Sequence, residues 1–335
     1  MIHVFSFWKS IKALLWLPTL RYLLTGIPLL IPFFLPGQQF PQYSQYLMHP
    51  TIYHPSVAVR NDAMCFGLGY RNQWMGFEDS QGKNISPRDF LVTAGIPVYA
   101  LNSRIGIVVN NSNLGYHNRT DFRLDYGFQV EVSSDNFLGF GLSGQLSRYQ
   151  MNLGQLTVAD PSDPLIKETD KQQAMFPEMG FGILYNGNNR FFAGISMMNL
   201  LASEYELGNL RFKDQQTAIF SANYKIGIID DRYRKVYFVP SVLLKSNFKT
   251  TQIDLNTTAF INDKYWAGMG YRLQDGFIIN AGIYLGDLMV GLSYDMNTGK
   301  IRDATKGGSV EIHLGYCLPI EKPRRIKSGF NTRCL

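Results

Sequence analysis

The sequence of 335 residues lacks long apolar runs: beyond residue 37, no segment approaches the roughly 20 apolar residues that a transmembrane helix needs. This absence excludes a helical membrane protein. An excess of basic charge is also absent. The formal net charge is +6, but Lys9, Lys12 and Arg21 lie in the first 37 residues, which contain no acid, so the rest carries +3 (6 − 3). Without a basic stripe, this charge does not indicate a nucleic-acid partner.

Cysteine is scarce. Cys65 and Cys317 fall in expected strands and Cys334 lies near the C-terminus. Three cysteines with these spacings match neither a disulfide framework nor a metal site. We therefore expect isolated thiols and no metal.

The sequence also has few residues suited to catalysis. No G-x-S-x-G elbow occurs, and only four histidines follow residue 37, namely His49, His54, His117 and His313. The segment 139–144 matches G-x-G-x-x-G, but that motif binds a dinucleotide only where it joins a strand to a helix. Here it lies inside an alternating strand. The acidic segment 160–170 has no EF-hand spacing and is expected to be a solvated loop. We expect no enzyme activity, no catalytic residues and no cofactor.

What the sequence does contain is a period-two alternation of apolar and polar residues. It covers residues 122–133, 138–150 and 309–318, where aromatic and aliphatic side chains alternate with charged, polar and glycine positions. Successive side chains of a strand point to opposite faces, so each segment has one apolar face and one polar face. Apolar faces rich in aromatics, with charges opposite, are typical of a transmembrane β-barrel with lipid outside and a polar lumen.

The alternation predicts an all-β fold, a transmembrane antiparallel β-barrel of about 14 strands. The expected strands cover residues 63–72, 88–98, 103–111, 119–133, 135–150, 173–186, 190–201, 214–228, 234–246, 250–261, 264–273, 276–285, 287–296 and 307–318. Short connections alternate with long ones at 73–87, 112–118, 151–172, 202–213 and 297–306, as expected for periplasmic turns and extracellular loops. Pro240 inside a strand removes a hydrogen-bond donor and predicts a bulge. Charges on the polar faces predict a lumenal network formed by Arg123, Asp125, Glu131, Lys225 and Lys245.

The alternation separates the chain into four parts. Residues 1–37 combine cations with a 14-residue apolar run at 22–35, followed by Pro36-Gly37, which indicates a signal peptide cleaved near Gly37. Residues 38–62 are interrupted by three prolines and are expected to form a periplasmic or lumenal N-terminal segment. Residues 63–318 are the expected outer-membrane barrel. Residues 319–335 form a C-terminal tail.

Several segments resemble one protein family. Residues 41–55 (PQYSQYLMHPTIYHP), 70–77 (YRNQWMGF), 291–299 (GLSYDMNTG) and 308–316 (GSVEIHLGY) are similar to consecutive blocks of the PorP/SprF family of type IX secretion system membrane proteins. The resemblance implies an outer-membrane barrel of the Bacteroidota secretion and gliding motility apparatus. Such a barrel would assist the export or surface attachment of a cargo protein with a C-terminal signal domain. The implied partners are periplasmic or lipoprotein secretion components, or a large secreted adhesin.

Partner contacts are expected at aromatic residues outside the strands. Tyr43, Tyr46 and Tyr53 lie in the N-terminal segment, and Trp74 and Phe77 lie in the first long loop. Large aromatics often anchor protein contacts. The alternative is that these residues plug or brace the lumen. The alternative function is an outer-membrane channel for small solutes or fatty acids, which an open lumen would favour.

Overall fold

The computed structural model describes residues 41–57, 63–152, 171–188, 190–298 and 300–320. The chain divides into two compact units, 1–36 and 37–335, and the description below concerns the second. The expected signal peptide, the acidic segment 160–170, Cys334 and most of the C-terminal tail lie outside the described residues. No helix among the described residues is long and apolar enough to cross a membrane.

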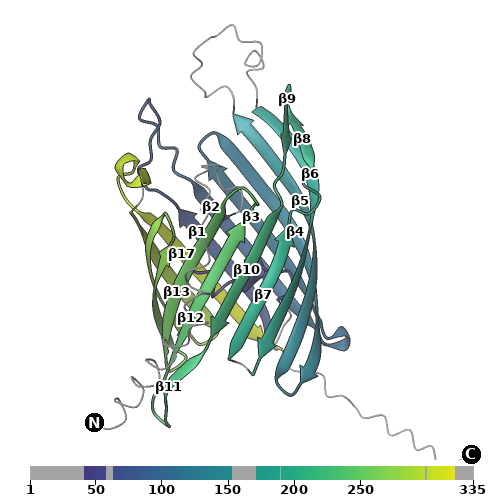
Figure 1. Cartoon of the computed structure of the whole chain (residues 1–335), viewed down its shortest axis with the longest axis vertical. Coiled ribbons are helices and arrows are strands. Elements are labelled where there is room, and N and C mark those ends of the chain that lie inside the picture. Colours follow the sequence, from purple (N-terminus) through teal and green to yellow (C-terminus); the bar gives the residue numbers. More distant parts are fainter. Residues whose placement is uncertain (1–40, 58–62, 153–170, 189, 299, 321–335) are drawn as a thin grey trace, which may run out of the picture. The chain divides into compact units, whose positions relative to one another are not determined.

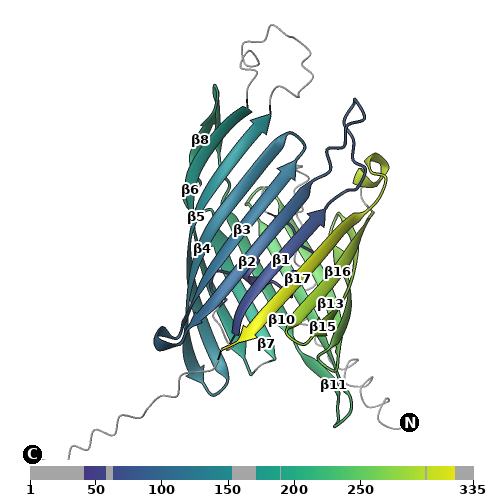
Figure 2. The same cartoon turned by 180° about the vertical axis from the view of Figure 1, so that it is seen from behind.

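A single antiparallel sheet closes on itself to form a barrel (Figures 1 and 2). Its strands are β1 (Ala63–Asn72), β2 (Arg88–Val98), β3 (Ser103–Leu114), β4 (His117–Ser133), β5 (Asn136–Asn152), β6 (Lys171–Gly187), β7 (Phe191–Met198), β10 (Thr217–Tyr224), β11 (Ile226–Asp230), β12 (Lys235–Ser246), β13 (Thr251–Ile261), β14 (Tyr265–Arg272), β15 (Gly276–Leu285), β16 (Leu288–Asn297) and β17 (Ser309–Pro319). Neighbours in sequence pair, β1 pairs with β17, and β10 pairs with β12. Because β10 and β11 share one position in the wall, the fifteen strands form the fourteen-strand barrel that the sequence predicts.

The smaller elements lie outside the barrel wall, η1 in the segment before β1 and the others in connections between barrel strands. They are the hairpin β8 (Glu204–Leu207) and β9 (Leu210–Lys213) and the 3₁₀ turns η1 (Pro50–Ile52), η2 (Tyr99–Leu101) and η4 (Lys300–Ala304). The expected loop at 112–118 is wrong, since β3 and β4 continue until Leu114 pairs with His117. Gly115, with φ near +59°, permits this two-residue turn.

The predicted facing of the strands is confirmed. In β4, Phe122 and Leu124 are 45% and 49% exposed on the outer wall, whereas Arg123 and Asp125 are buried on the lumen face. Large apolar side chains cover the outer face of the other strands in the same way. An apolar outside and a polar, charged inside are what a lipid surround requires. β1 starts and β17 ends at the end with the short turns, which is the periplasmic end in barrels of this class.

Pro240 does not cause the predicted bulge. β12 pairs with β13 without a register shift, and Pro240 stands opposite Thr257. On the other side, pairing with β10 stops before Tyr224 and resumes with β11 after Lys225 in the same register. Because Pro240 has no N–H, it cannot donate a hydrogen bond to the chain between β10 and β11. The ladder on this side of β12 is therefore interrupted at Pro240. The bulge lies further along, at Ile228 in β11.

The expectation of isolated thiols is also wrong. Cys65 and Cys317 form a disulfide that joins β1 to β17, with Cα atoms 4.1 Å apart. The two residues are 252 positions apart in sequence. They become direct cross-strand partners only because the barrel closes between its first and last strands, which spacing along the chain does not reveal.

Candidate functional site: the plugged lumen

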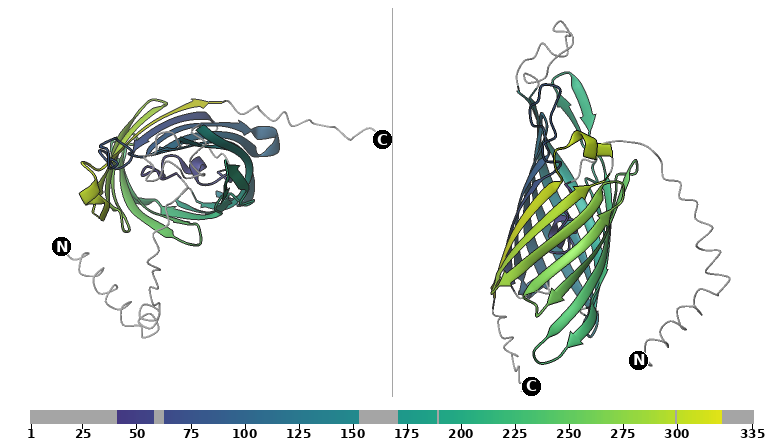
Figure 3. Two further views of the ribbon diagram at one scale, coloured as in Figure 1. Left: turned by 90° about the horizontal axis from the view of Figure 1, so that it is seen from above. Right: turned by 90° about the vertical axis from the view of Figure 1, so that its left-hand side faces the viewer.

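Residues 41–57, called the plug below, occupy the barrel lumen. Seen from above, this purple segment lies inside the ring of strands (Figure 3). Tyr43, Tyr46 and Tyr53 are at most 4% exposed, and they pack with Ile52 in the main apolar cluster of the lumen. The remaining members of that cluster are Leu91, Val108, Met198, Ile219 and Leu243, which come from five wall strands. The plug is therefore packed against five strands of the wall by apolar contacts alone.

A carboxylate on β17 holds the start of the plug by its backbone. Glu311, fully buried, accepts the N–H of Ser44 at 2.7 Å and the N–H of Gln45 at 2.9 Å, one on each oxygen. Arg71 of β1 donates to the same carboxylate at 3.0 Å. Because a folded loop has no other partners for these amides, the carboxylate satisfies groups that would be costly to bury alone.

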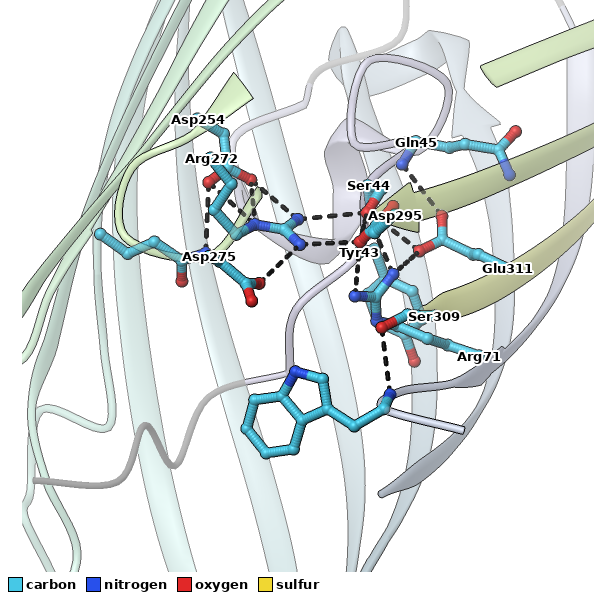
Figure 4. A network of polar contacts seen from close by, with 12 residues as sticks. Tyr43, Ser44, Gln45, Arg71, Asp254, Arg272, Asp275, Asp295, Ser309 and Glu311 are labelled. Carbon is cyan, nitrogen blue, oxygen red and sulfur yellow. Dashed lines mark hydrogen bonds and ion pairs between the residues drawn. The ribbon is translucent and has the colours of Figure 1, made fainter. Parts of the chain in front are cut away.

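The network extends from this carboxylate to neighbouring strands (Figure 4). Asp295 of β16 accepts from Arg71 at 2.7 Å, from Arg272 of β14 at 2.8 Å, and from the hydroxyl of Ser44 at 2.7 Å. Arg272 in turn pairs with Asp254 of β13 at 3.0 Å. All four charged side chains are at most 5% exposed. Buried charges of both signs thus compensate one another around a single plug serine.

A second cation holds the middle of the plug. Arg123 donates to the carbonyls of Thr51 and Ile52, at 2.6 and 3.0 Å, at the end of η1. Asp125, two residues along the same face, aligns the guanidinium through two bonds of 2.8 and 3.1 Å. This pair belongs to the lumenal network that the sequence predicts, but two predicted members do not join it, since Glu131 is exposed and Lys225 lies over the ring of Tyr237 at 3.8 Å. Another predicted member, Lys245, is buried and donates to the carbonyl of Pro41 at 3.3 Å.

Two plug histidines lie against the wall. His49 stacks on His313 of β17 with ring centroids 4.4 Å apart. His54 bridges Ser196 of β7 and Ser221 of β10, with ring nitrogens 2.7 and 2.6 Å from the two hydroxyls. Burial lowers the pKa of His49 and of His54, with nearby His313 and Arg123 adding to the effect. Both plug histidines are therefore neutral at pH 7.

The tyrosines of the plug use their hydroxyls inside the lumen. Tyr43 donates to Asn110 at 2.6 Å, and the Tyr46 hydroxyl lies 2.9 Å from that of Ser241. The hydroxyl of Tyr53 accepts the N–H of Tyr43 at 3.0 Å. None of the three rings is on a surface that a partner could reach while the plug is in place.

The glycines of the G-x-G-x-x-G segment have a packing role here. A Cβ on Gly141 would lie 2.2 Å from the backbone N of Ser56, and one on Gly139 would lie 2.8 Å from its carbonyl. Gly182 on the neighbouring strand lies close to the Ser56 hydroxyl in the same way. The wall therefore lacks side chains where the backbone of the plug passes closest.

Trp74 and Phe77 lie apart from the tyrosines, in the extracellular loop between β1 and β2. Both are half-buried, and their rings meet edge to face at 6.3 Å. The backbone N–H of Trp74 donates to the hydroxyl of Ser309 at 3.1 Å, and the backbone of Met75 bonds to that of Gly307 and Gly308. The loop is thus fixed at the start of β17, where Ser309 precedes Glu311 by two residues.

The mouth of the lumen carries a further aromatic cluster. Tyr205 of the β8–β9 hairpin stacks on Phe176 of β6 at 4.3 Å and on Phe212 at 5.7 Å. Arg119 fixes the end of the hairpin through two bonds of 3.0 Å to Asp214. The described residues contain no group of three or more His, Cys, Asp or Glu side chains that could hold a metal ion.

The sequence did not single out Arg71, Glu311, Asp295, Arg272 and Asp254 as plug anchors. The signal was present, since each is a charge on the polar face of an alternating segment. Alternation places a residue in the lumen, but it does not say which residues on distant strands meet.

The fold and lumen define an outer-membrane β-barrel whose interior is filled by its own N-terminal segment. The chain belongs to the PorP/SprF family: the model of "Type IX secretion system membrane protein PorP/SprF" matches residues 36–316. No curated protein matches the chain. The chain is an outer-membrane protein of the type IX secretion family, in agreement with the resemblance seen in the sequence.

Three solved structures are similar to this chain at low identity. A FadL homologue of Pseudomonas aeruginosa is 10% identical with a TM-score of 0.43, covering 80% of this chain and 93% of that one. The P. putida toluene transporter TodX is 9% identical with a TM-score of 0.46, covering 81% and 94%. Omp33 of Acinetobacter baumannii is 10% identical with a TM-score of 0.40, covering 77% and 100%. At this identity the likeness concerns the fold alone.

Proposed function

We propose that this barrel is a non-conducting component of the type IX secretion and gliding apparatus. It assists the export or surface attachment of a cargo protein that carries a C-terminal signal domain. The observation that supports this proposal is the plug. A fourteen-strand barrel is wide enough to hold a channel, but here aromatic rings, ion pairs and main chain fill the lumen. A small-solute channel would need that space.

The partners that this function requires are proteins. They are periplasmic or lipoprotein components of the secretion system, or a large secreted adhesin. No enzymatic step, cofactor or metal is part of the proposal. Residues 1–37 serve as the export signal, and cleavage near Gly37 leaves a mature chain that begins a few residues before the plug.

The aromatic residues divide into two roles under this proposal. Trp74 and Phe77 are the partner contacts, because they are half-exposed at the extracellular end. Tyr43, Tyr46 and Tyr53 are buried and hold the plug in the lumen. These tyrosines would contact a partner only if the plug left the barrel.

Conductance of the purified protein in planar bilayers tests the main proposal. The plugged barrel is expected to give no steady current. A stable open pore at wild-type sequence would instead support the alternative, a channel for small solutes or fatty acids.

Alanine variants test the two roles separately. Trp74→Ala with Phe77→Ala should leave barrel levels normal, measured by heat-modifiable gel migration, and reduce surface display of the cargo. Tyr43→Ala with Tyr46→Ala should instead destabilise the plugged barrel. Phe248→Ala is the matched control, since Phe248 is an exposed aromatic on another extracellular turn. Unchanged display in the first variant would refute the partner role of Trp74 and Phe77.

A further inference from the structure

The outer wall contains a hollow where β10 meets β12, among the strands at the front of Figure 1. Its volume is about 460 Å³, which is within the roughly 300–1,000 Å³ usual for ligand sites. Pairing on either side of the interrupted ladder places Tyr224 opposite Pro240. A row of outward side chains therefore crosses five strands, in the order Phe191, Tyr224, Pro240, Thr257 and Met269. Pro240 and Thr257 are small, and they leave the hollow between the exposed side chains of Tyr224 and Met269.

The hollow lies at the depth of the lipid hydrocarbon. The apolar pair of Phe220 and Leu244 continues the outer wall toward the extracellular end. The apolar pair of Ile226 and Phe238 continues it toward the periplasmic end, and these two side chains are 42% and 39% exposed. Because the outer face is apolar on both sides of the hollow, membrane lipid and not water covers this part of the wall. A ligand that reaches the hollow therefore comes from the membrane.

A main-chain acceptor beside the hollow lacks its usual donor. The N–H of Lys225 donates to the carbonyl of Arg190, just before β7, at 2.7 Å. The main-chain groups of successive strand residues point to opposite sides, so the N–H and carbonyl of Tyr224 point away from β7 and toward Pro240 of β12. The N–H of Tyr224 can donate to the carbonyl of Pro240, but Pro240 has no N–H to donate in return. The carbonyl of Tyr224 is therefore left without a donor from the ladder.

The carbonyl of Tyr224 makes the hollow more selective than its apolar lining suggests. The hydrocarbon of a bilayer holds no water to supply the missing bond, so an unsatisfied main-chain group is costly there. A plain alkyl chain fills the apolar space but leaves the carbonyl unsatisfied. A chain that bears a hydroxyl group fills the same space and donates its O–H to the carbonyl. The site therefore favours the hydroxylated chain by about the strength of one hydrogen bond to a buried acceptor.

We propose that the hollow binds a hydroxylated acyl chain of an outer-membrane lipid. The chain lies across Pro240 and Thr257, with Tyr224 on one side and Met269 on the other, and its hydroxyl donates to the carbonyl of Tyr224. The lipid keeps its headgroup, because the hollow opens along the lipid-facing surface and does not enclose its occupant. The site is on the outer face of the wall, whereas the plug contacts the inner face. Binding there does not depend on which protein the barrel assists.

Competition labelling tests the role of the hydroxyl group. The full barrel, purified in detergent, is labelled by a photoactivatable long-chain alcohol, and modified peptides of β10 and β12 are identified by mass spectrometry. An unlabelled long-chain alcohol should compete about tenfold better than its methyl ether, which has the same chain but no donor. In Pro240→Ala the new N–H can donate to the carbonyl of Tyr224, so the alcohol and the ether should compete equally. Equal competition in the wild type, or an undiminished preference in Pro240→Ala, would overturn the proposal.

Two leucine variants test the place of binding. Ala222→Leu fills the hollow, whereas Ala218→Leu makes the same change on the outer face of β10 beyond it. Saturable labelling should be lost in the first variant and kept in the second. Thr257→Leu fills the hollow from β13, and it replaces Ala222→Leu if that variant does not assemble, as judged by heat-modifiable migration. Labelling that stays saturable in the filled barrel places the bound chain elsewhere and contradicts the proposal.

Lipids that copurify with the barrel test the source of the chain. Lipid-linked hydroxylated chains should be enriched over the bulk outer membrane in the wild type and in Ala218→Leu, but not in the filled variant. A composition equal to that of the bulk membrane, or the same enrichment in the filled variant, counts against the site. Recovery of hydroxylated chains only in free form counts against a membrane lipid as their source.

Discussion

Replacing Glu311 by glutamine should release the plug while leaving the barrel assembled. Glu311 is fully buried, and its carboxylate accepts two plug amides as well as Arg71. Glutamine retains one acceptor oxygen, but its NH₂ group would face one of the amide donors of the plug. The substitution also removes the negative charge opposite Arg71. Breaking a buried ion pair on one side typically costs about 3–5 kcal/mol. Arg71 keeps Asp295 as a partner, so we expect the lower end, about 3 kcal/mol.

That loss corresponds to an increase of about 100-fold in the population with an undocked plug. The strand ladders do not depend on the carboxylate, so heat-modifiable migration should persist. The plug contains tyrosines but no lysine or arginine, so chymotrypsin rather than trypsin is the suitable probe. Cleavage within residues 43–53 should accelerate by a similar factor, and step-like conductance should appear in planar bilayers.

The control is Glu131→Gln, because Glu131 is an exposed carboxylate near the periplasmic end of β4. It should behave as wild type in both assays. If Glu311→Gln stays closed and protected from protease, the plug is held by apolar packing and the ion network is dispensable. That result would refute the reasoning above.

Four further predictions follow from the facing of the wall and the packing of the plug. Leu142→Arg places a cation on the lipid face, where Leu142 is 57% exposed, and should destabilise the barrel by about 2–4 kcal/mol in urea titrations, unlike Leu142→Val. Gly141→Ala should weaken plug docking by about 1–3 kcal/mol, since its Cβ would lie 2.2 Å from the plug backbone, whereas Gly144→Ala meets nothing within 4 Å and should be neutral in the same protease assay. Cys317→Ser should lower the free energy of unfolding by about 2–4 kcal/mol, and reducing agent should have no further effect on this variant. Burial lowers the pKa of His49 to about 3 and that of His54 to about 4, so the released plug binds a proton more tightly at each; docking should weaken as pH falls from 6.5 toward 4, by about 2 kcal/mol per histidine at pH 5, and His54→Gln should remove about half of this dependence.

Part of the lumen differs from what the alternation alone suggests. Ser143 is on the polar face of the alternating segment 138–150, and polar facing alone would suggest a wet site with room for a larger side chain. In the structure Ser143 is 4% exposed, and a Cβ on Gly180 would lie 2.4 Å from its hydroxyl. A lumen filled by the plug is a packed core, so polar facing does not imply room for a larger side chain.

The sequence by itself determined the strands and their two faces. β1 and β2 begin and end at the predicted residues, and the outward position of Phe122 and the inward position of Arg123 follow from period-two alternation. These features are local: a strand alternates whatever its neighbours are, and lipid on one side requires apolar residues there. The family was also recognisable from short blocks of sequence.

Only the tertiary structure decided which distant residues meet. The disulfide of Cys65 with Cys317 and the contact of Arg71 with Glu311 both depend on barrel closure between β1 and β17. The path of the plug depends on which side chains of distant strands meet inside the barrel. Closure and strand stagger are set by the whole sheet at once, so no local pattern contains them, and these global features bring the plug and the lumen-facing charges of distant strands together.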